Sequence, residues 1–298
     1  MKRILVIFIG LTISLFTFAQ KHYATAESHS FLVWGSGGIS TTADQLDWTT
    51  TKLGGGGMLG AGYQWQKRLF IINTGAELSF QHRTLSVSNT QIEQDMLDTE
   101  QMPFTYRGYI KDRTDNMNSL DINLPLMVGM KGEKAYFLAG LKFSINAYTW
   151  TDQHAMYSTD GLYDRFYDPL VNMPNHGFHD YEPASSKHSC WLGAELMGAV
   201  EAGVVIPTSN KNTKIRLGLF ADYGIYQYNV RIINNQGPAL QADWKQNLQL
   251  TLNHAYLSNE GIRAALHNVN AGIKLTIQWQ YESGYPCLIC RWNHSKFN

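Results

Sequence analysis

The chain has 298 residues, and its 24 basic and 24 acidic side chains give a formal net charge of zero, so nothing in its charge favours a nucleic-acid partner. Charged residues make up only 16% of the sequence, against about 25% in typical soluble domains. Beyond residue 20 no apolar segment approaches the roughly 18 to 20 residues that a membrane-spanning helix needs, which excludes a polytopic helical protein. A soluble fold and a membrane β-barrel remain, and the low charge and abundant Gly and aromatic residues favour the barrel.

The first residues have the layout of a secretory signal peptide. Lys2 and Arg3 precede an apolar run over 4–16, and Ala19 provides a small residue for cleavage. The run is too short for a membrane helix, and no Cys follows it as a lipid acceptor. The expected division is a signal peptide over 1–19, a β-barrel over 20–281 and a periplasmic C-terminal tail over 282–298.

Alternation of apolar and polar residues with period two recurs eight times, and it predicts strands with one apolar face. The clearest example is 266–280, where Val269, Ile273 and Ile277 alternate with polar or small residues. The expected strands are 29–39, 54–66, 69–82, 119–130, 135–147, 189–206, 215–230 and 266–280.

The connections between these strands alternate in length. Three are short, at 67–68, 131–134 and 207–214, and four are long, at 40–53, 83–118, 148–188 and 231–265. Strands that run up and down a barrel bring all long connections to one rim. The sequence therefore predicts an all-β fold, an eight-stranded antiparallel up-and-down transmembrane β-barrel with short periplasmic turns and long extracellular loops.

Charged residues within the strands indicate which face points outward. Lys142 and Lys274 lie in mid-strand, where a lipid-facing Lys costs about 2 to 4 kcal/mol, and both belong to the polar set. We therefore expect the apolar face to contact lipid and the ionised residues to form a charge network in the barrel interior. The expected members are Glu77, Asp121, Lys142, Glu195, Glu201, Arg216, Asp222 and Lys274.

Two segments carry a resemblance to a known family. The signal ending Phe18-Ala19-Gln20 and the strand Leu120-Asp121-Ile122-Asn123-Leu124-Pro125-Leu126 resemble the outer-membrane β-barrel family of Bacteroidota, the porin-like or PorT-like group related in architecture to OmpA and OmpX. The resemblance covers most of 29–280. It implies location in the outer membrane of a Gram-negative cell, with both termini in the periplasm.

The last expected strand is similar to the signal that the barrel-assembly machinery reads. Its elements are a polar residue, a Gly two positions later, apolar residues at alternate positions and a terminal aromatic residue. The matching residues are Asn270, Gly272, Leu275, Ile277 and Trp279. An ordinary amphipathic strand is the alternative interpretation.

Cysteines are sparse and do not form a disulfide framework. Cys287 and Cys290 have Cys-x-x-Cys spacing, which permits a local disulfide in an oxidising compartment, while a redox-active pair or half of a zinc site are the alternatives. Cys190 is expected to be buried and unpaired.

The connection 148–188 combines carboxylates, imidazoles and aromatic residues. Such residues can bind a cation, a partner or a glycan, but they match neither an EF-hand nor a His-Glu-x-x-His motif. The simpler interpretation is a solvated loop that packs on its own aromatic residues, and we expect no metal and no cofactor.

The function that the sequence favours is a non-enzymatic barrel whose external loops serve contact, adhesion or complex assembly, with a lumen plugged by side chains. Its expected partners are outer-membrane lipid, the assembly machinery and a surface or envelope protein. One alternative is an enzyme that acts on lipid A, phospholipid or peptides through rim residues, and another is a narrow channel for small solutes. The candidate rim residues are Ser79, His82, Ser144, His188 and Ser189, but no Gly-x-Ser-x-Gly motif accompanies them, so no catalytic residue is predicted.

Overall fold

The computed structural model describes residues 27–43, 49–98, 100–210, 212–232, 240–243, 249–252 and 267–282. The expected signal peptide and the Cys287 and Cys290 pair lie outside these residues. Antiparallel strands dominate the described part, which also contains a 3-10 turn at Pro174–His176. No helix in the described ranges is long and apolar enough to cross a bilayer.

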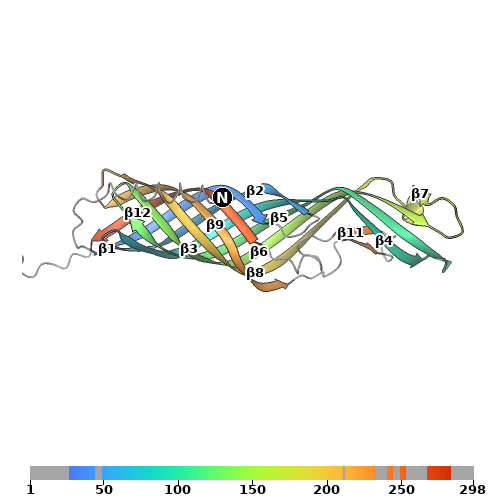
Figure 1. The fold of residues 1–298 in the computed structure, drawn as a ribbon, viewed down its shortest axis with the longest axis horizontal. Helices are drawn as coiled ribbons and strands as arrows, with labels where there is room; N and C mark the ends of the chain where they lie inside the picture. The colour runs from blue at the N-terminus through green and yellow to red at the C-terminus, as the bar shows by residue number, and fades with distance from the viewer. Residues whose placement is uncertain are drawn as a thin grey trace, which may run out of the picture.

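Eight long strands close into a ring, shown in Figure 1. The ring order is β1, β2, β3, β5, β6, β8, β9 and β12, and the pairings of β5 with β6 and of β12 with β1 complete it. The prediction of an eight-stranded antiparallel barrel is confirmed. The strands are β1 (Glu27–Ala43), β2 (Thr49–Lys67), β3 (Phe70–Val87), β5 (Pro103–Lys131), β6 (Ala135–Leu162), β8 (Glu182–Pro207), β9 (Thr213–Ile232) and β12 (His267–Glu282).

The two faces of the wall differ as the alternation predicts. On β5, Ile122, Leu124 and Leu126 are 43 to 57% exposed, whereas Asp121 and Asn123 between them are buried. The other strands of the ring follow the same rule. The outer surface of the barrel is therefore apolar, and its lumen is lined mostly by polar side chains.

Aromatic residues mark the two limits of the apolar outer surface. Phe80 and Trp150 contact each other at one limit, and Phe31 packs against Trp279 at the other. From Phe70 to Phe80 a strand covers about 33 Å, or about 25 Å along the barrel axis at the tilt usual for such barrels. This height matches the apolar band of an outer-membrane barrel.

The two ends of the barrel differ. Tight connections join β2 to β3, β5 to β6 and β8 to β9 at one end, which also holds Glu27 at the start of β1. We call this the turn end and the opposite end the sheet end.

The expectation of long loops at 83–118 and 148–188 is wrong. β5 has 29 residues and β6 has 28, so both continue far beyond the apolar band as a hairpin. β4 (Thr90–Leu97) pairs with β5 on one side of this hairpin, and β7 (Leu170–Val171) pairs with β6 on the other. A further hairpin of β10 (Leu240–Asp243) and β11 (Gln249–Leu252) lies within the connection 231–265.

The projecting sheet consists of β4, β7, residues 103–111 of β5 and residues 155–162 of β6, together with the connecting segment 163–181. In Figure 1 it extends from the right-hand end of the barrel. Its hairpin reaches about 30 Å past the barrel at the usual rise of a strand. The chain therefore places a structured sheet, rather than loops, at the sheet end.

Candidate functional site

The projecting sheet has a hydrophobic core of its own. Phe104 and Tyr106 are two residues apart on β5 and so lie on the same face of the sheet. Both are buried together with Met96, Tyr163 and Phe178. The rings of Phe104 and Tyr163 stack with their centroids 4.8 Å apart, and Phe178 meets Phe104 edge-on at 6.2 Å. Burial of several aromatic side chains in so small a sheet supplies the energy that orders it.

The segment that follows β6 folds back over this core and is held there by hydrogen bonds. The Thr159 backbone N–H donates to His179 O over 2.8 Å, and the Thr159 hydroxyl donates to Gly177 O over 3.0 Å. Gly161 is needed for this approach, because a Cβ at that position would overlap the Phe178 ring. Across the hairpin, Arg107 Nε pairs with Asp160 Oδ1 at 2.7 Å.

Exposed apolar side chains gather at the far end of the projecting sheet. Tyr167 is fully exposed, and the guanidinium of Arg165 lies 4.9 Å from the ring centroid of its neighbour Phe166. We call this cluster the tip, and its exposed members are Leu97, Met102, Leu162, Phe166, Tyr167 and Val171. Apolar residues gathered on an exposed surface outside the lipid band are typical of a contact site for a partner.

Burial in the sheet core changes the acidity of tyrosines. Desolvation raises the pKa of Tyr106 to about 12, and it raises the pKa of Tyr157 and Tyr163 as well. Ionisation of these hydroxyls is therefore coupled to the folding of the projecting sheet.

The middle of the lumen contains a layer of ion pairs. Lys142 Nζ lies 2.9 Å from Glu77 Oε1 and 2.9 Å from Asp222 Oδ2, and all three side chains are at most 5% exposed. Lys274 Nζ lies 2.8 Å from Glu201 Oε2. These five expected residues of the network meet within the lumen although they come from five different strands.

Trp34 connects these two groups. Its indole N–H donates to Glu77 Oε2 over 2.8 Å, and its ring lies 4.7 Å from Lys274 Nζ. The ring lies flat along the wall, where a Cβ on Gly60, Gly62 or Gly75 would collide with it. The space that this side chain occupies thus contributes to the requirement for Gly at these three positions of β2 and β3.

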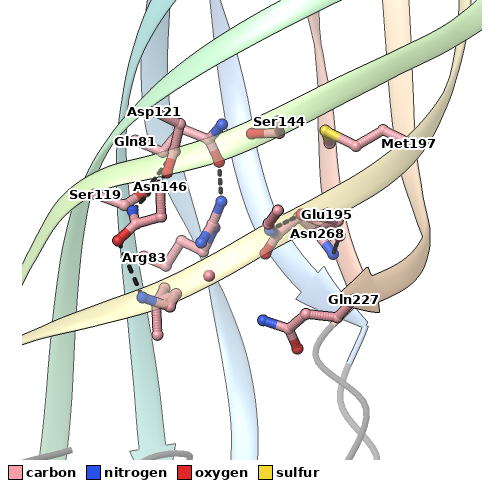
Figure 2. A pocket seen from close by; sticks show the side chains of 13 residues that line it. Gln81, Arg83, Ser119, Asp121, Ser144, Asn146, Glu195, Met197, Gln227 and Asn268 are labelled. Atoms are coloured by element: carbon pink, nitrogen blue, oxygen red, sulfur yellow. Dashed lines mark hydrogen bonds between the residues drawn. The ribbon is translucent and has the colours of Figure 1, made fainter. Parts of the chain in front are cut away.

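The sheet-end part of the lumen contains a small polar cavity, shown in Figure 2. Asp121 accepts hydrogen bonds from Asn146 and Ser119, and Glu195 accepts two from the backbone and side-chain amides of Asn268. Arg83 lies between these two carboxylates and donates to Ser40 and Gln81. The expected residues Asp121 and Glu195 are therefore in the lumen, but amides and hydroxyls are their hydrogen-bond partners.

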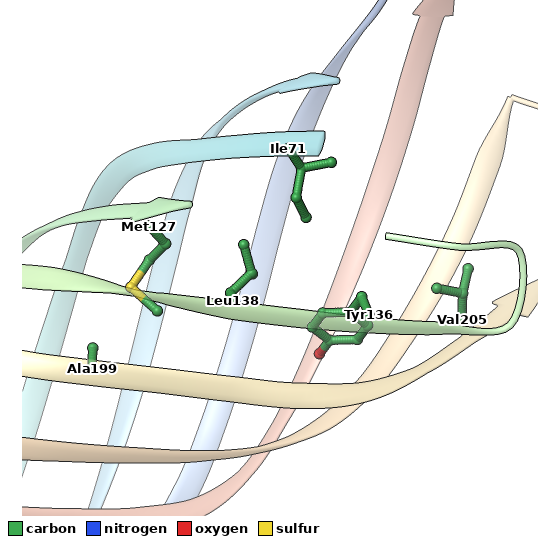
Figure 3. Packing of buried hydrophobic residues seen from close by; sticks show 6 residues of the cluster. All are labelled: Ile71, Met127, Tyr136, Leu138, Ala199 and Val205. Atoms are coloured by element: carbon green, nitrogen blue, oxygen red, sulfur yellow. The ribbon is translucent and has the colours of Figure 1, made fainter. Parts of the chain in front are cut away.

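The turn end of the lumen contains an apolar cluster, shown in Figure 3. Its members are Ile71, Met127, Tyr136, Leu138, Ala199 and Val205. The Tyr136 hydroxyl donates to Glu201 Oε1 over 2.7 Å, and the Tyr136 ring lies 5.0 Å from the guanidinium of Arg216. Arg216, the last expected residue of the network, donates to Gln64 Oε1 rather than to a carboxylate.

Sequence reasoning missed several buried charges of the lumen. Arg83 and Lys131 are 2% exposed, and Arg113 and Asp115 form a buried pair with 2.9 Å between Nε and Oδ1. Arg83 has the same parity as Glu77 on β3, so an extension of the alternation beyond residue 82 would have found it. The expected strand, 69–82, ends one residue before it.

The serines and histidines considered for catalysis do not converge. Ser79 and Ser144 are buried in the lumen, whereas His82 is on the outer side of β3, where its Nδ1 bonds Asn118. His188 Nε2 lies 3.1 Å from Ser186, but the Ser186 hydroxyl donates to Gln153, so the ring is not placed as a base for it. Among the residues that the structure describes, no histidine or cysteine lines the cavity.

Several of the acidic and histidine residues of 148–188 form ion pairs. Asp160 pairs with Arg107, Asp152 with Lys187 at 3.5 Å, and His179 with Glu182 at 3.1 Å. Within the described ranges, no group of three or more His, Cys, Asp and Glu residues is arranged to hold a metal ion.

The expected assembly-signal residues all lie on β12, the strand that pairs with β1 to close the ring. Asn270 and Gly272 belong to the lumen face, and Leu275, Ile277 and Trp279 belong to the outer face. Their role in assembly stays a prediction.

No protein-family model matches this chain, and no curated protein matches it. Among solved structures it is similar to the attachment invasion locus protein Ail of Yersinia pestis, solved in complex with the heparin analogue sucrose octasulfate, at 10% identity and a TM-score of 0.24. That match covers 87% of this chain and 100% of Ail. It is also similar to Neisserial surface protein A (NspA) at 7% identity and a TM-score of 0.28, over 83% of this chain and 96% of NspA. Since both scores are low, the fold is identified by the closed ring of strands itself.

The ion-pair layer predicts a large effect of removing its central cation. Lys142→Met leaves Glu77 and Asp222 buried without their partner, so it should lower the free energy of unfolding by about 3 to 5 kcal/mol. Urea unfolding of the protein refolded in phospholipid vesicles measures this. The triple variant Lys142→Met, Glu77→Gln, Asp222→Asn removes the charges together and should recover most of the loss; a triple variant as unstable as the single one would contradict the account.

The raised pKa of Tyr106 predicts an alkaline transition of the projecting sheet. Because the folded-state pKa exceeds the value of about 10 for an unfolded tyrosine, this contribution to stability is complete below about pH 10 and is lost as the pH rises towards 12. Near-ultraviolet circular dichroism should show the sheet core disordering in this range, and Tyr106→Phe should move the transition to higher pH. Tyr167→Phe, at an exposed position, is the matched control; equal transitions in the two variants would refute the assignment.

Proposed function

We propose that this chain is a non-enzymatic outer-membrane barrel that makes contact with a partner protein or surface outside the cell through its projecting sheet. The observation that carries the proposal is the tip, an exposed apolar cluster held on a sheet that has its own aromatic core. The lipid bilayer would contain the apolar band between the aromatic limits, which supports outer-membrane lipid as the surroundings of the barrel.

The rigidity of the projecting sheet supports a role in binding. A loop that orders only on contact loses conformational entropy at that moment, whereas a sheet ordered in advance does not. The stacking of Phe104 on Tyr163 and the hydrogen bonds of Thr159 supply this order without a partner. The exposed Tyr167 and Phe166 then offer large contact areas at low entropic cost.

A second feature of the projecting sheet supports contact by strand pairing. β4 pairs with β5 along one side, and in the described part of the chain no strand pairs with its other side. The backbone N–H of Asp98 donates to Met102 O, so it points towards β5. Because backbone groups of successive residues in a strand point to opposite sides, those of Asp95 and Glu93 point to the open side. An open edge of this length is a template for a strand of another chain.

We further propose that the lumen is plugged and carries no sustained ion current. The layer of Lys142, Glu77 and Asp222 and the apolar cluster around Tyr136 support this, because an eight-stranded barrel encloses a space that side chains fill.

Membership of the PorT-like group of Bacteroidota, termini in the periplasm and recognition of β12 by the assembly machinery belong to the same proposal. The start of β1 at the turn end and the place of β12 as the closing strand support it.

Site-specific photo-crosslinking in the native bacterium tests the contact role. A photoreactive amino acid at Tyr167 or Leu97 should give a defined adduct, and the same group at Ser185 on the outer wall of the barrel should not. The double variant Phe166→Ser, Tyr167→Ser, made in the chain with the photoreactive group at Leu97, should reduce the adduct at least tenfold without changing the amount of folded barrel, because both residues are exposed.

The same strains provide the controls. Lys187→Ser, also on an exposed position, should leave the adduct unchanged. Equal adducts at Ser185 and at the tip, or an adduct insensitive to the double variant, would sink the proposed contact role.

A further inference from the structure

The charged residues of the lumen are balanced in total but not along the barrel. Five carboxylates and five cations line the lumen from Lys131 at the turn end to Arg83 towards the sheet end, and the pair Arg113 and Asp115 lies further towards the sheet end. The carboxylates are Glu77, Asp121, Glu195, Glu201 and Asp222, and the cations are Arg83, Lys131, Lys142, Arg216 and Lys274.

The cations in excess are at the turn end. Lys131 is the last residue of β5, and Arg216 lies near the start of β9. The two charges act on each other, and among the described side chains no carboxylate lies within 4 Å of either one. Glu201 attracts Arg216 from a longer distance, but its two oxygens are bonded to Lys274 and Tyr136.

Buried hydrogen-bond donors without acceptors surround these cations. Gln64 Nε2 and Arg216 Nε have no hydrogen-bond partner in the described structure, and neither does the hydroxyl of Thr276, which pairs with Arg216 across β12 and β9. Gln64 and Thr276 are fully buried, and Arg216 is 1% exposed. Such groups cost free energy unless something accepts their hydrogen bonds.

The other hydrogen bonds of Lys131, Gln64 and Arg216 do not use the unpaired donors. Lys131 Nζ donates to Gln278 Oε1 over 2.5 Å, Gln278 Nε2 donates to Ser30, and Arg216 Nη1 donates to Gln64 Oε1 over 3.0 Å. The oxygens of both amides are therefore used, while an N–H of Gln64 and the Nε–H of Arg216 are not. A set of donors and positive charges without an anion is the chemistry of an anion site.

We propose that the turn end of the lumen binds one small inorganic anion of halide size between Arg216, Lys131 and Gln64. Chloride accepts several N–H donors at once, is little larger than a water molecule, and neutralises part of the local excess of positive charge. A water molecule would satisfy one or two donors but would leave the charge uncompensated. The site is independent of the proposed contact role of the projecting sheet, which lies at the opposite end of the barrel.

Two measurements on the full-length folded protein test the site. The thermal midpoint in detergent should rise in a saturable way by several degrees when chloride or bromide replaces gluconate at constant ionic strength. Crystals grown in sodium bromide should show one anomalous peak within hydrogen-bond distance of Arg216 Nε and Gln64 Nε2.

Three variants complete the test. Lys131→Gln and Arg216→Gln should each abolish most of the halide-dependent rise, whereas Lys187→Gln, an exposed cation at the opposite end of the barrel, should retain it. If Arg216→Gln fails to fold, Lys131→Gln and the anomalous peak still decide. The absence of the peak, or a rise that is the same in Lys131→Gln as in the natural protein, would overturn the proposal.

Discussion

Closure of the strand ring is the constraint on which the rest of this structure depends. In hydrocarbon a backbone N–H or C=O without a partner costs several kcal/mol, so a sheet that lies in lipid has to pair its first strand with its last. The pairing of β1 with β12 achieves this and fixes the alternation of every strand between lipid and lumen. An eight-stranded ring encloses a narrow space, and polar side chains that face inward are removed from water and must find partners there.

The partners found in the lumen divide it into three levels. At mid-height, Lys142 and Lys274 bind carboxylates directly, and Trp34 joins the two groups. Towards the sheet end, amides and hydroxyls satisfy Asp121 and Glu195, and towards the turn end Arg216 and Lys131 are left with amide oxygens alone. Outside the lipid band the same strands β5 and β6 leave the ring and form a sheet whose order comes from buried aromatic residues instead. One pair of strands thus connects a barrel held by polar contacts to a sheet held by apolar contacts.

The number, direction and inward face of the strands were predictable from sequence because lipid imposes a strict period of two. The projecting sheet was not predictable in this way, because the outer residues of β3, β5 and β6 become polar at His82, Asn118 and Asp152, so the apolar alternation that marks a lipid-facing strand ends there. Alternation continues there, but the buried face is apolar instead of polar, as Phe104 and Tyr106 show. Pairing across the lumen was also not predictable from sequence, since it depends on the stagger of the ring. Lys142 on β6 meets Glu77 on β3 and Asp222 on β9, whereas Arg216 donates its hydrogen bond to the amide of Gln64.

The most direct test of a lipid-facing outer surface is a scan of spin labels along β5. After the three natural cysteines are replaced by serine, a nitroxide is placed singly at positions 122 to 128 of the protein in lipid vesicles. The account predicts that oxygen accessibility rises and falls with period two, high at Ile122, Leu124, Leu126 and Val128 and low at the three positions between them. Uniform accessibility, or high accessibility of the even positions to a water-soluble nickel complex, would contradict it.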